Sequence, residues 1–138
     1  MSFSRVYSLQ THGLKGIVVS VETDLSRGLY SFSVVGLPDK AVEESRDRMA
    51  SALKNSGLES PKSKNQKVIV SLSPADLKKE GAYFDLAMAL GYLLSDELIS
   101  FDPEKKAFIG ELSLNGELRT VKGVLPLVEE KKKKGFEE

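Results

Sequence analysis

The side chains that could do chemistry gather in the segment SLSPADLKKEGAYFD, which spans residues 71–85. Ser71 and Ser73 lie close in sequence to Lys78 and Lys79, and a Ser–Lys pair can cleave peptide bonds. The lysine must then lose its water, because desolvation lowers its pKa and lets it act as a base. Here the two lysines stand side by side next to Glu80. This grouping predicts solvated lysines rather than a catalytic base.

The same segment is also a candidate phosphate site. A P-loop needs the pattern GxxxxGK[ST], so that successive backbone amides surround the phosphates. This pattern is absent, and LKKEGA offers only Gly81 with Lys78 and Lys79. An exposed loop with a turn glycine is therefore the favoured interpretation, and anion binding by the two lysines stays a weaker alternative.

Four carboxylates could meet at one edge of a sheet: Asp76, Glu80, Asp85 and Glu111. Asp76 and Glu80 are expected to cap a turn or to lie in water. Asp85 is different, because it is the only charge in the apolar segment 83–94. A buried carboxylate needs partners. We therefore predict that Asp85 caps its helix or pairs with a nearby Arg or Lys.

Other nucleophile and metal chemistry finds little support. The chain has no cysteine and one histidine, His12, which excludes disulfides, thiolate chemistry and His-rich metal sites. His12, Asp85 and Ser73 can be written as a catalytic triad, but nothing in their spacing supports it. No metal site and no cofactor are expected in this chain.

The composition indicates one folded domain over residues 1–138. Of these residues 41% are hydrophobic and 29% charged, which argues against disorder. The formal net charge is zero, so only a local patch could attract nucleic acid or an anionic membrane. The start, MSFSRVYSLQTHG, shows no signal peptide, and no segment is apolar for long enough to span a bilayer. A cytoplasmic protein is expected.

Two basic clusters are candidates for anion or DNA contact. Arg46 and Arg48 lie on a predicted helix, and Lys62, Lys64 and Lys67 lie in or beside the loop GLESPKSKNQ. A solvated surface is the simpler interpretation, and DNA contact through the loop lysines stays open.

The elements that would position these residues alternate between strands and helices. Residues 3–35 read as three β-strands whose short connections favour antiparallel neighbours. The later elements are a helix at 39–56 capped by Asp39, a strand at 68–72, a helix at 83–94, a strand at 107–112 with a two-residue Asn115–Gly116 turn, and a helix at 124–134. The β-branched run 68–72 suits a central strand that is covered on both faces. The order predicts an α+β sandwich, in which a mixed sheet is covered by helices.

Three segments carry a family resemblance: VGLPDKAVEESRDRMASALKNSG (35–57), VSLSPADLKKEGAYFDLAMALGYL (70–93) and FIGELSLNGELRTVKGVLP (108–126). They resemble the N-terminal domain of the ComM/YifB family of magnesium chelatase-like AAA+ ATPases. The resemblance implies the fold of the Lon protease catalytic domain, the RadA C-terminal domain and the GHMP kinases. It implies an AAA+ module after residue 138, with ATP and Mg²⁺ as that module's cofactors. It also implies a homo-hexameric helicase that processes branched or single-stranded DNA in natural transformation.

The resemblance to Lon also implies that the catalytic dyad is absent. Tyr83 falls where the Lon serine would stand, at the start of a core helix, and Leu125 falls where the Lon lysine would stand. A phenol and an aliphatic side chain cannot perform Ser–Lys chemistry. The segment 80–85 also lacks the several glycines and serines with which GHMP kinases bind phosphate.

Taken together, these features predict a non-catalytic domain that serves assembly, regulation or DNA contact beside an ATPase ring. Two alternatives remain open from the residues alone. One is a peptidase or phosphate-binding enzyme that uses loop 73–85, and the other is a stand-alone DNA-binding module.

Overall fold

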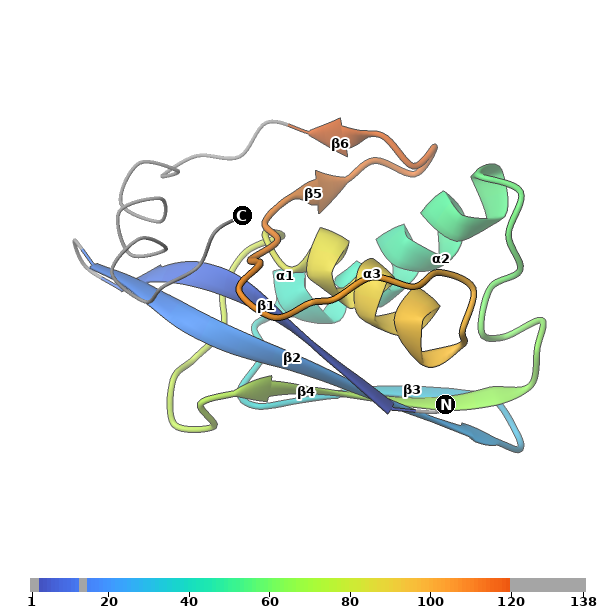
Figure 1. Ribbon diagram of the computed structural model, residues 1–138, viewed down its shortest axis with the longest axis horizontal. Coiled ribbons are helices and arrows are strands. Elements are labelled where there is room, and N and C mark those ends of the chain that lie inside the picture. Colours follow the sequence, from blue (N-terminus) through green and yellow to red (C-terminus); the bar gives the residue numbers. More distant parts are fainter. Residues whose placement is uncertain (1–2, 13–14, 120–138) are drawn as a thin grey trace.

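A computed structural model describes residues 3–12 and 15–119. The elements run β1 (Phe3–His12), β2 (Lys15–Arg27), β3 (Ser31–Val35), α1 (Lys40–Glu43), α2 (Ser45–Asn55), β4 (Gln66–Ser73), α3 (Asp85–Ser95), β5 (Glu111–Leu112) and β6 (Leu118–Arg119). The three helices lie together on one face of the main sheet (Figure 1). This arrangement confirms the predicted α+β class, with a mixed sheet and helices. The helix predicted at 124–134 lies outside the described residues.

In the described part of the chain, the main sheet has four strands in the order β1-β2-β4-β3. β2 is antiparallel to β1 and to β4, whereas β3 is parallel to β4. The antiparallel pairing of the first two strands is confirmed. The expectation that the third strand pairs with the second is wrong, because β4 lies between them. The chain returns from β3 through α1 and α2, and this crossover lets β4 pair with strands on both sides.

Within the described residues, one face of β4 is covered and the other is exposed. Val68, Val70 and Leu72 point into the core and are completely or almost completely buried, whereas Ile69 between them is 48% exposed. The strand therefore alternates buried and exposed residues, as expected for a sheet that is covered on a single face. The prediction that this strand is covered on both faces is wrong. The β-branched residues indicated that the segment forms a strand, but they did not indicate how many faces of that strand are covered.

The helix predicted at 39–56 forms as two pieces. Asp39 is its N-cap as predicted, because Asp39 Oδ1 accepts a hydrogen bond from the Val42 amide at 2.8 Å. The helix is then interrupted at Glu44, and α2 begins at Ser45. Val42, Met49 and Leu53 reach the core from these two pieces, and Ala87, Met88 and Tyr92 reach it from α3. Ser45 and Arg48, which follow this break, both contact Asp85 at the start of α3.

The C-terminal part of the described chain forms a small hairpin over the helices (Figure 1). The strand predicted at 107–112 is shorter than expected, because only Glu111–Leu112 forms β5. β5 pairs antiparallel with β6. The turn is not the predicted type I′, since Gly116 has a φ of +95° but Asn115 is not in the positive-φ region. The Gly116 amide donates to the Ser113 carbonyl at 3.0 Å, which fits a longer loop with glycine in the left-handed position.

Candidate functional site at the loop between β4 and α3

The loop from Pro74 to Phe84 is held from one side by Gln10 of β1. Gln10 is 5% exposed, and its side-chain amide forms two hydrogen bonds with the loop backbone. Nε2 donates to the Lys78 carbonyl at 2.8 Å, and Oε1 accepts from the Glu80 amide at 2.9 Å. One buried amide therefore fixes both sides of Lys79. The sequence gives no sign of this contact, because Gln10 reads as an ordinary strand residue.

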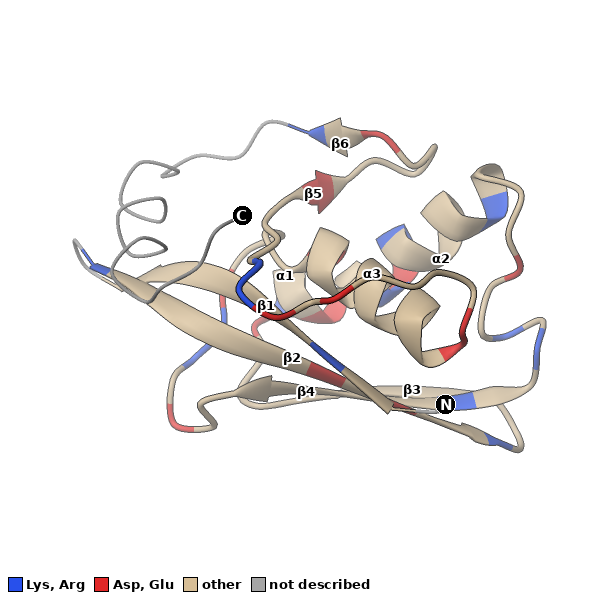
Figure 2. Ribbon diagram, viewed as in Figure 1, with Lys and Arg blue, Asp and Glu red and all other residues tan. Residues whose placement is uncertain are grey.

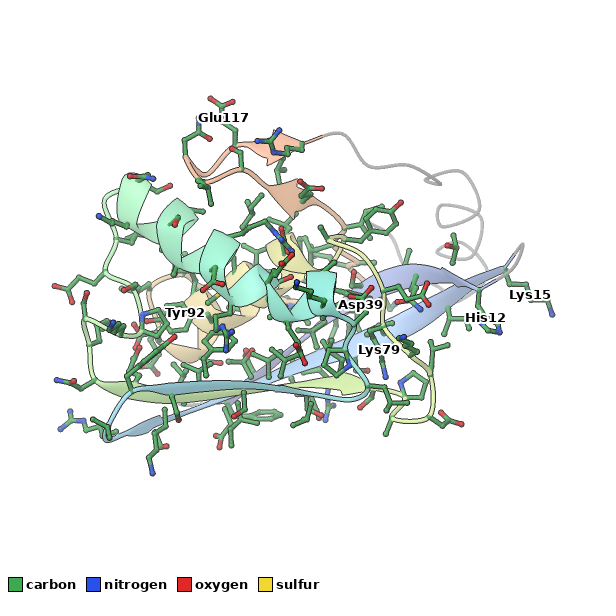
Figure 3. The ribbon with its side chains drawn as sticks, turned by 180° about the vertical axis from the view of Figure 1, so that it is seen from behind. His12, Lys15, Asp39, Lys79, Tyr92 and Glu117 are labelled. Carbon is green, nitrogen blue, oxygen red and sulfur yellow. The ribbon has the colours of Figure 1, made fainter. Side chains whose placement is uncertain are left out.

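Asp39 holds the same loop from the other side. The Lys79 amide donates to the Leu37 carbonyl and the Asp39 amide donates to the Lys79 carbonyl, both at 2.9 Å. The second carboxylate oxygen of Asp39 accepts from the Gly81 amide at 3.1 Å. Figure 3 shows Asp39 and Lys79 close together where α1 begins. Asp39 thus caps α1 and binds the loop at once, and only the first role was predicted.

Lys79 is completely buried, so the prediction of a solvated lysine is wrong at this position. Its amino group donates to the carbonyl of Pro74. Burial lowers the pKa of Lys79 below its ordinary value, and the charge of Asp76 opposes this shift to a smaller extent. The backbone bridge to Leu37 and Asp39 turns the side chain inward, whereas the neighbouring Lys78 is exposed as expected. A buried Lys79 does not present its charge to DNA at the surface.

Asp85 is the most fully bonded side chain of the site. It is 0% exposed, and four hydrogen bonds reach its two carboxylate oxygens. Oδ1 accepts from Ser45 Oγ at 2.5 Å and from an Arg48 guanidinium nitrogen at 3.0 Å. Oδ2 accepts from Arg48 Nε at 2.6 Å and from the Leu112 amide at 3.0 Å. The prediction that Asp85 pairs with an arginine or lysine is confirmed.

Arg48 belongs to the same cluster of hydrogen bonds. Its guanidinium also donates to the Ala41 carbonyl at 2.7 Å. The hydrogen bonds and charge of Asp85 raise the pKa of Arg48, against the effect of burial. Arg48 and Asp85 form a bidentate, charge-assisted pair. Arg48 therefore serves Asp85 and is not a free cation for DNA.

The four candidate carboxylates do not form one cluster. Asp76 and Glu80 are exposed on the loop, Asp85 is buried, and Glu111 forms an ion pair of 3.7 Å with Arg119. Among the described residues, no group of three or more His, Cys, Asp or Glu side chains is placed to hold a metal ion.

His12 and Ser73 of the hypothetical triad are also kept apart. His12 pairs with Lys15 at the tip of the β1–β2 hairpin, while Ser73 pairs with Ser20. Five positions along β2 separate these levels, which is about 17 Å at the usual rise of a strand. Figure 3 shows His12 and Lys15 together at this tip, away from Asp39 and Lys79.

Of the two degenerate dyad positions, the structure describes one. Tyr83 lies just before α3, half-buried, and its carbonyl accepts a hydrogen bond from the Gly110 amide at 3.0 Å. Leu125 lies outside the described residues. Tyr83 therefore stands at the junction of the loop, α3 and the segment that leads to β5.

A second polar cluster, which sequence reasoning missed, lies at the opposite end of β4. The buried Tyr92 hydroxyl donates to Gln66 Oε1 at 2.6 Å, and Gln66 Nε2 donates to Asp96 Oδ1 at 2.9 Å. Lys64 also bonds Asp96. Burial raises the pKa of Tyr92, so the phenol stays protonated as a donor. A tyrosine within an apolar helix was the available signal, because a buried hydroxyl needs a partner.

The candidate basic residues occupy different places. Arg46 is exposed on α2, and Arg48 is turned inward. Lys62 is exposed and Lys64 is paired with Asp96. An open cavity of about 680 Å³ lies beside Lys64, and its lining also includes Arg27, Leu29 and Asp96. Figure 2 shows basic residues on the loop that leads into β4.

Comparison with known protein families identifies a match over most of the chain. Residues 21–138 match the model of a protein family described as subunit ChlI of Mg-chelatase. The chain belongs to this family. Among its described residues, no helix has the length and apolar character that crossing a bilayer requires.

The curated relatives narrow this assignment to the N-terminal domain of the ComM/YifB branch. The chain is 43% identical to competence protein ComM of Haemophilus influenzae over 93% of its own length and 25% of that protein. It is 38% identical to YifB of Escherichia coli over 98% of its length and 26% of that protein. An uncharacterized protein of Mycobacterium bovis is 39% identical over 99% and 27%. The chain thus spans about a quarter of the length of the curated relatives that it matches.

Proposed function

We propose that the chain is a non-catalytic N-terminal domain of a ComM-type AAA+ protein, and that it serves assembly or regulation beside the ATPase ring. ATP and Mg²⁺ belong to the AAA+ module in this proposal, and the whole protein is a homo-hexamer that processes DNA in natural transformation. The relatives support it because each is about four times as long as the region that matches, and one is named for competence.

The observation that carries the proposal is the state of Asp85. A general base or nucleophile needs a lone pair that faces substrate. All four contacts of the Asp85 carboxylate come from the protein itself, and the group is fully buried. Lys79, whose pKa is lowered by burial, is buried against the Pro74 carbonyl. Lys79 therefore stabilises the loop and Asp85 joins α3 to α2 and β5, and these uses favour a scaffold over an active site.

A direct assay tests the proposal. The purified chain is expected to hydrolyse neither unfolded protein substrates nor ATP. Turnover that survives repurification and is lost in Tyr83→Phe or Lys79→Met, but not in the exposed control Lys78→Met, would overturn it. That result would support the peptidase or phosphate-binding alternative at loop 73–85.

DNA contact is a second candidate role, and a specific observation favours it. The strand register brings Arg27 and Lys67 to the same end of the sheet as Lys62, because Arg27 pairs with Gln66. All three side chains are exposed. Basic side chains that gather at one end of a domain can bind phosphates by releasing counterions, even when the net charge is zero.

The test for this role is binding of the chain to branched DNA at low and high salt. Reversal of two charges in Lys62→Glu/Lys67→Glu is expected to weaken binding and to reduce its salt dependence. Lys40→Glu/Lys54→Glu, which reverses two charges at exposed positions of α1 and α2, is the matched control. An equal loss in both variants, or no binding at low salt, contradicts a specific role of this end. Lys64 is left unchanged because it already pairs with Asp96.

A further inference from the structure

The two edges of the main sheet differ in whether another segment pairs with the edge strand. At the β1 edge, Tyr7 forms a parallel bridge with Ala107, and the Phe108 amide donates to the Tyr7 carbonyl at 2.8 Å. At the other edge stands β3, which pairs only with β4 within the described part of the chain. Figure 3 shows β3 running along this side of the sheet. An edge strand of this kind presents backbone N–H and C=O groups that can pair with another strand.

The β3 edge lacks the usual protection against such pairing. Charged residues or proline within an edge strand normally prevent association. The run from Gly28 to Pro38 has no charge, and its only proline follows the strand. Several large apolar side chains are exposed along it: Leu29 at 86%, Val35 at 45% and Leu37 at 53%, with Ile69 of β4 at 48% beside them. The β3 edge is therefore uncharged and apolar, and both properties favour pairing with another strand.

We propose that β3 pairs with β3 of a second copy of this chain. The two strands run antiparallel about a two-fold axis at Ser33, and the two sheets join into one. In this register Phe32 stands opposite Val34 of the second copy, on the face that the helices cover. On the open face Ser31 stands opposite Val35, and the exposed Leu29 lies toward Leu37 of the second copy.

A second copy fits this edge for two reasons. An uncharged strand is the partner that desolvates no charge here, and the same run in another copy is uncharged over its whole length. The spacing is also symmetrical, because Leu29 and Leu37 lie at equal distances from Ser33. A two-fold contact therefore covers Leu29, the most exposed large apolar residue of the described chain, together with Leu37 in both copies at once. The inference rests on this edge alone and does not depend on the proposed function.

Charge exchange at the two-fold axis tests the inference. Ser33 is exposed, so Ser33→Lys and Ser33→Glu each place like charges opposite one another without disturbing the core. Sedimentation velocity over a range of concentrations is expected to show a monomer–dimer equilibrium for the unchanged chain. The dissociation constant of the dimer is expected to be at least about tenfold higher for each variant alone than for the unchanged chain. An equimolar mixture of the two variants is expected to recover dimers, because opposite charges then meet.

The control is Ser100→Lys, which adds the same charge at an exposed position of the segment after α3. It is expected to dimerise like the unchanged chain. The inference is overturned if the unchanged chain is monomeric at every concentration, which would leave the edge to another partner. It is also overturned if Ser33→Lys dimerises normally, or if the mixture of the two charged variants stays monomeric.

Discussion

The carboxylate of Asp85 at the start of α3 accepts a hydrogen bond of 2.6 Å from Nε of Arg48 in α2. Asp85 is fully buried, whereas the side chain of Arg48 is 19% exposed. The pair joins α2 to the start of α3. The Ser45 hydroxyl and the Leu112 amide complete the cluster, so each carboxylate oxygen accepts two hydrogen bonds.

Removing the arginine should leave this carboxylate buried without its counter-charge. We predict that Arg48→Ala lowers the free energy of unfolding by about 3–5 kcal/mol, as measured by urea denaturation. Arg46→Ala, on the same helix but exposed, is the control and should change it by less than about 0.5 kcal/mol. Similar losses in the two variants would show that the buried pair contributes no more to the free energy of unfolding than an exposed arginine does.

Gly36 should not tolerate a side chain. Its φ is +108°, and a Cβ atom would lie 2.0 Å from the carbonyl oxygen of Leu72. We predict that Gly36→Ala destabilises the fold by about 3 kcal/mol or more. Gly57 also has a positive φ, of +83°, but nothing lies within 4 Å of its Cβ position. Gly57→Ala should therefore cost only about 1–2 kcal/mol, and thermal unfolding of both variants would separate the clash from the backbone strain.

The hold of Gln10 on the loop predicts a local effect. Gln10→Ala removes both side-chain hydrogen bonds to Lys78 and Glu80. The Glu80 amide should then exchange its hydrogen faster, by a local free energy of about 1–3 kcal/mol. Hydrogen exchange measured by mass spectrometry reads this out directly. Thr11→Ala, one residue further along β1, is the control, and equal exchange in the two variants would contradict the role of Gln10.

The burial of Lys79 predicts a dependence of stability on pH. Its pKa in the folded state lies below the ordinary value of 10.5. Between the two values the unfolded state binds more protons, so the free energy of unfolding rises with pH in this window. Lys79→Met lacks this titration. We therefore predict that the unchanged chain gains stability relative to Lys79→Met as the pH is raised toward 10.5.

Urea denaturation at a series of pH values measures this difference. Lys78→Met is expected to keep the rise, because Lys79 is still present. A constant difference between the unchanged chain and Lys79→Met over the whole window would mean that Lys79 titrates alike in both states.

Local patterns predicted much of the fold. β-branched alternation located the strands, and Asp39 marked the start of the first helix as its N-cap. The lone charge in an apolar helix predicted the pairing of Asp85. These features depend on neighbours in sequence or on one strong energetic rule. The contacts of Gln10 with the loop join residues that are far apart in the chain, and no local preference encodes them.

The errors have the same origin. The two lysines at 78 and 79 look identical in sequence, yet one is exposed and the other buried. The difference arises from the backbone bridge between Pro38 and Lys79, which sets the direction of each side chain. The number of layers over β4 was also beyond reach, because burial of Ile69 depends on what packs outside the sheet rather than on its own propensity.

The bond from the Leu112 amide to Asp85 has a mechanical meaning. It ties the β5–β6 hairpin to the same oxygen that Arg48 Nε grips, so the hairpin cannot lift away without stripping a donor from a buried charge. A force on the hairpin is therefore passed to α2 and α3 through Asp85, alongside the bond from the Asn55 side chain of α2 to the Leu114 carbonyl at 2.8 Å.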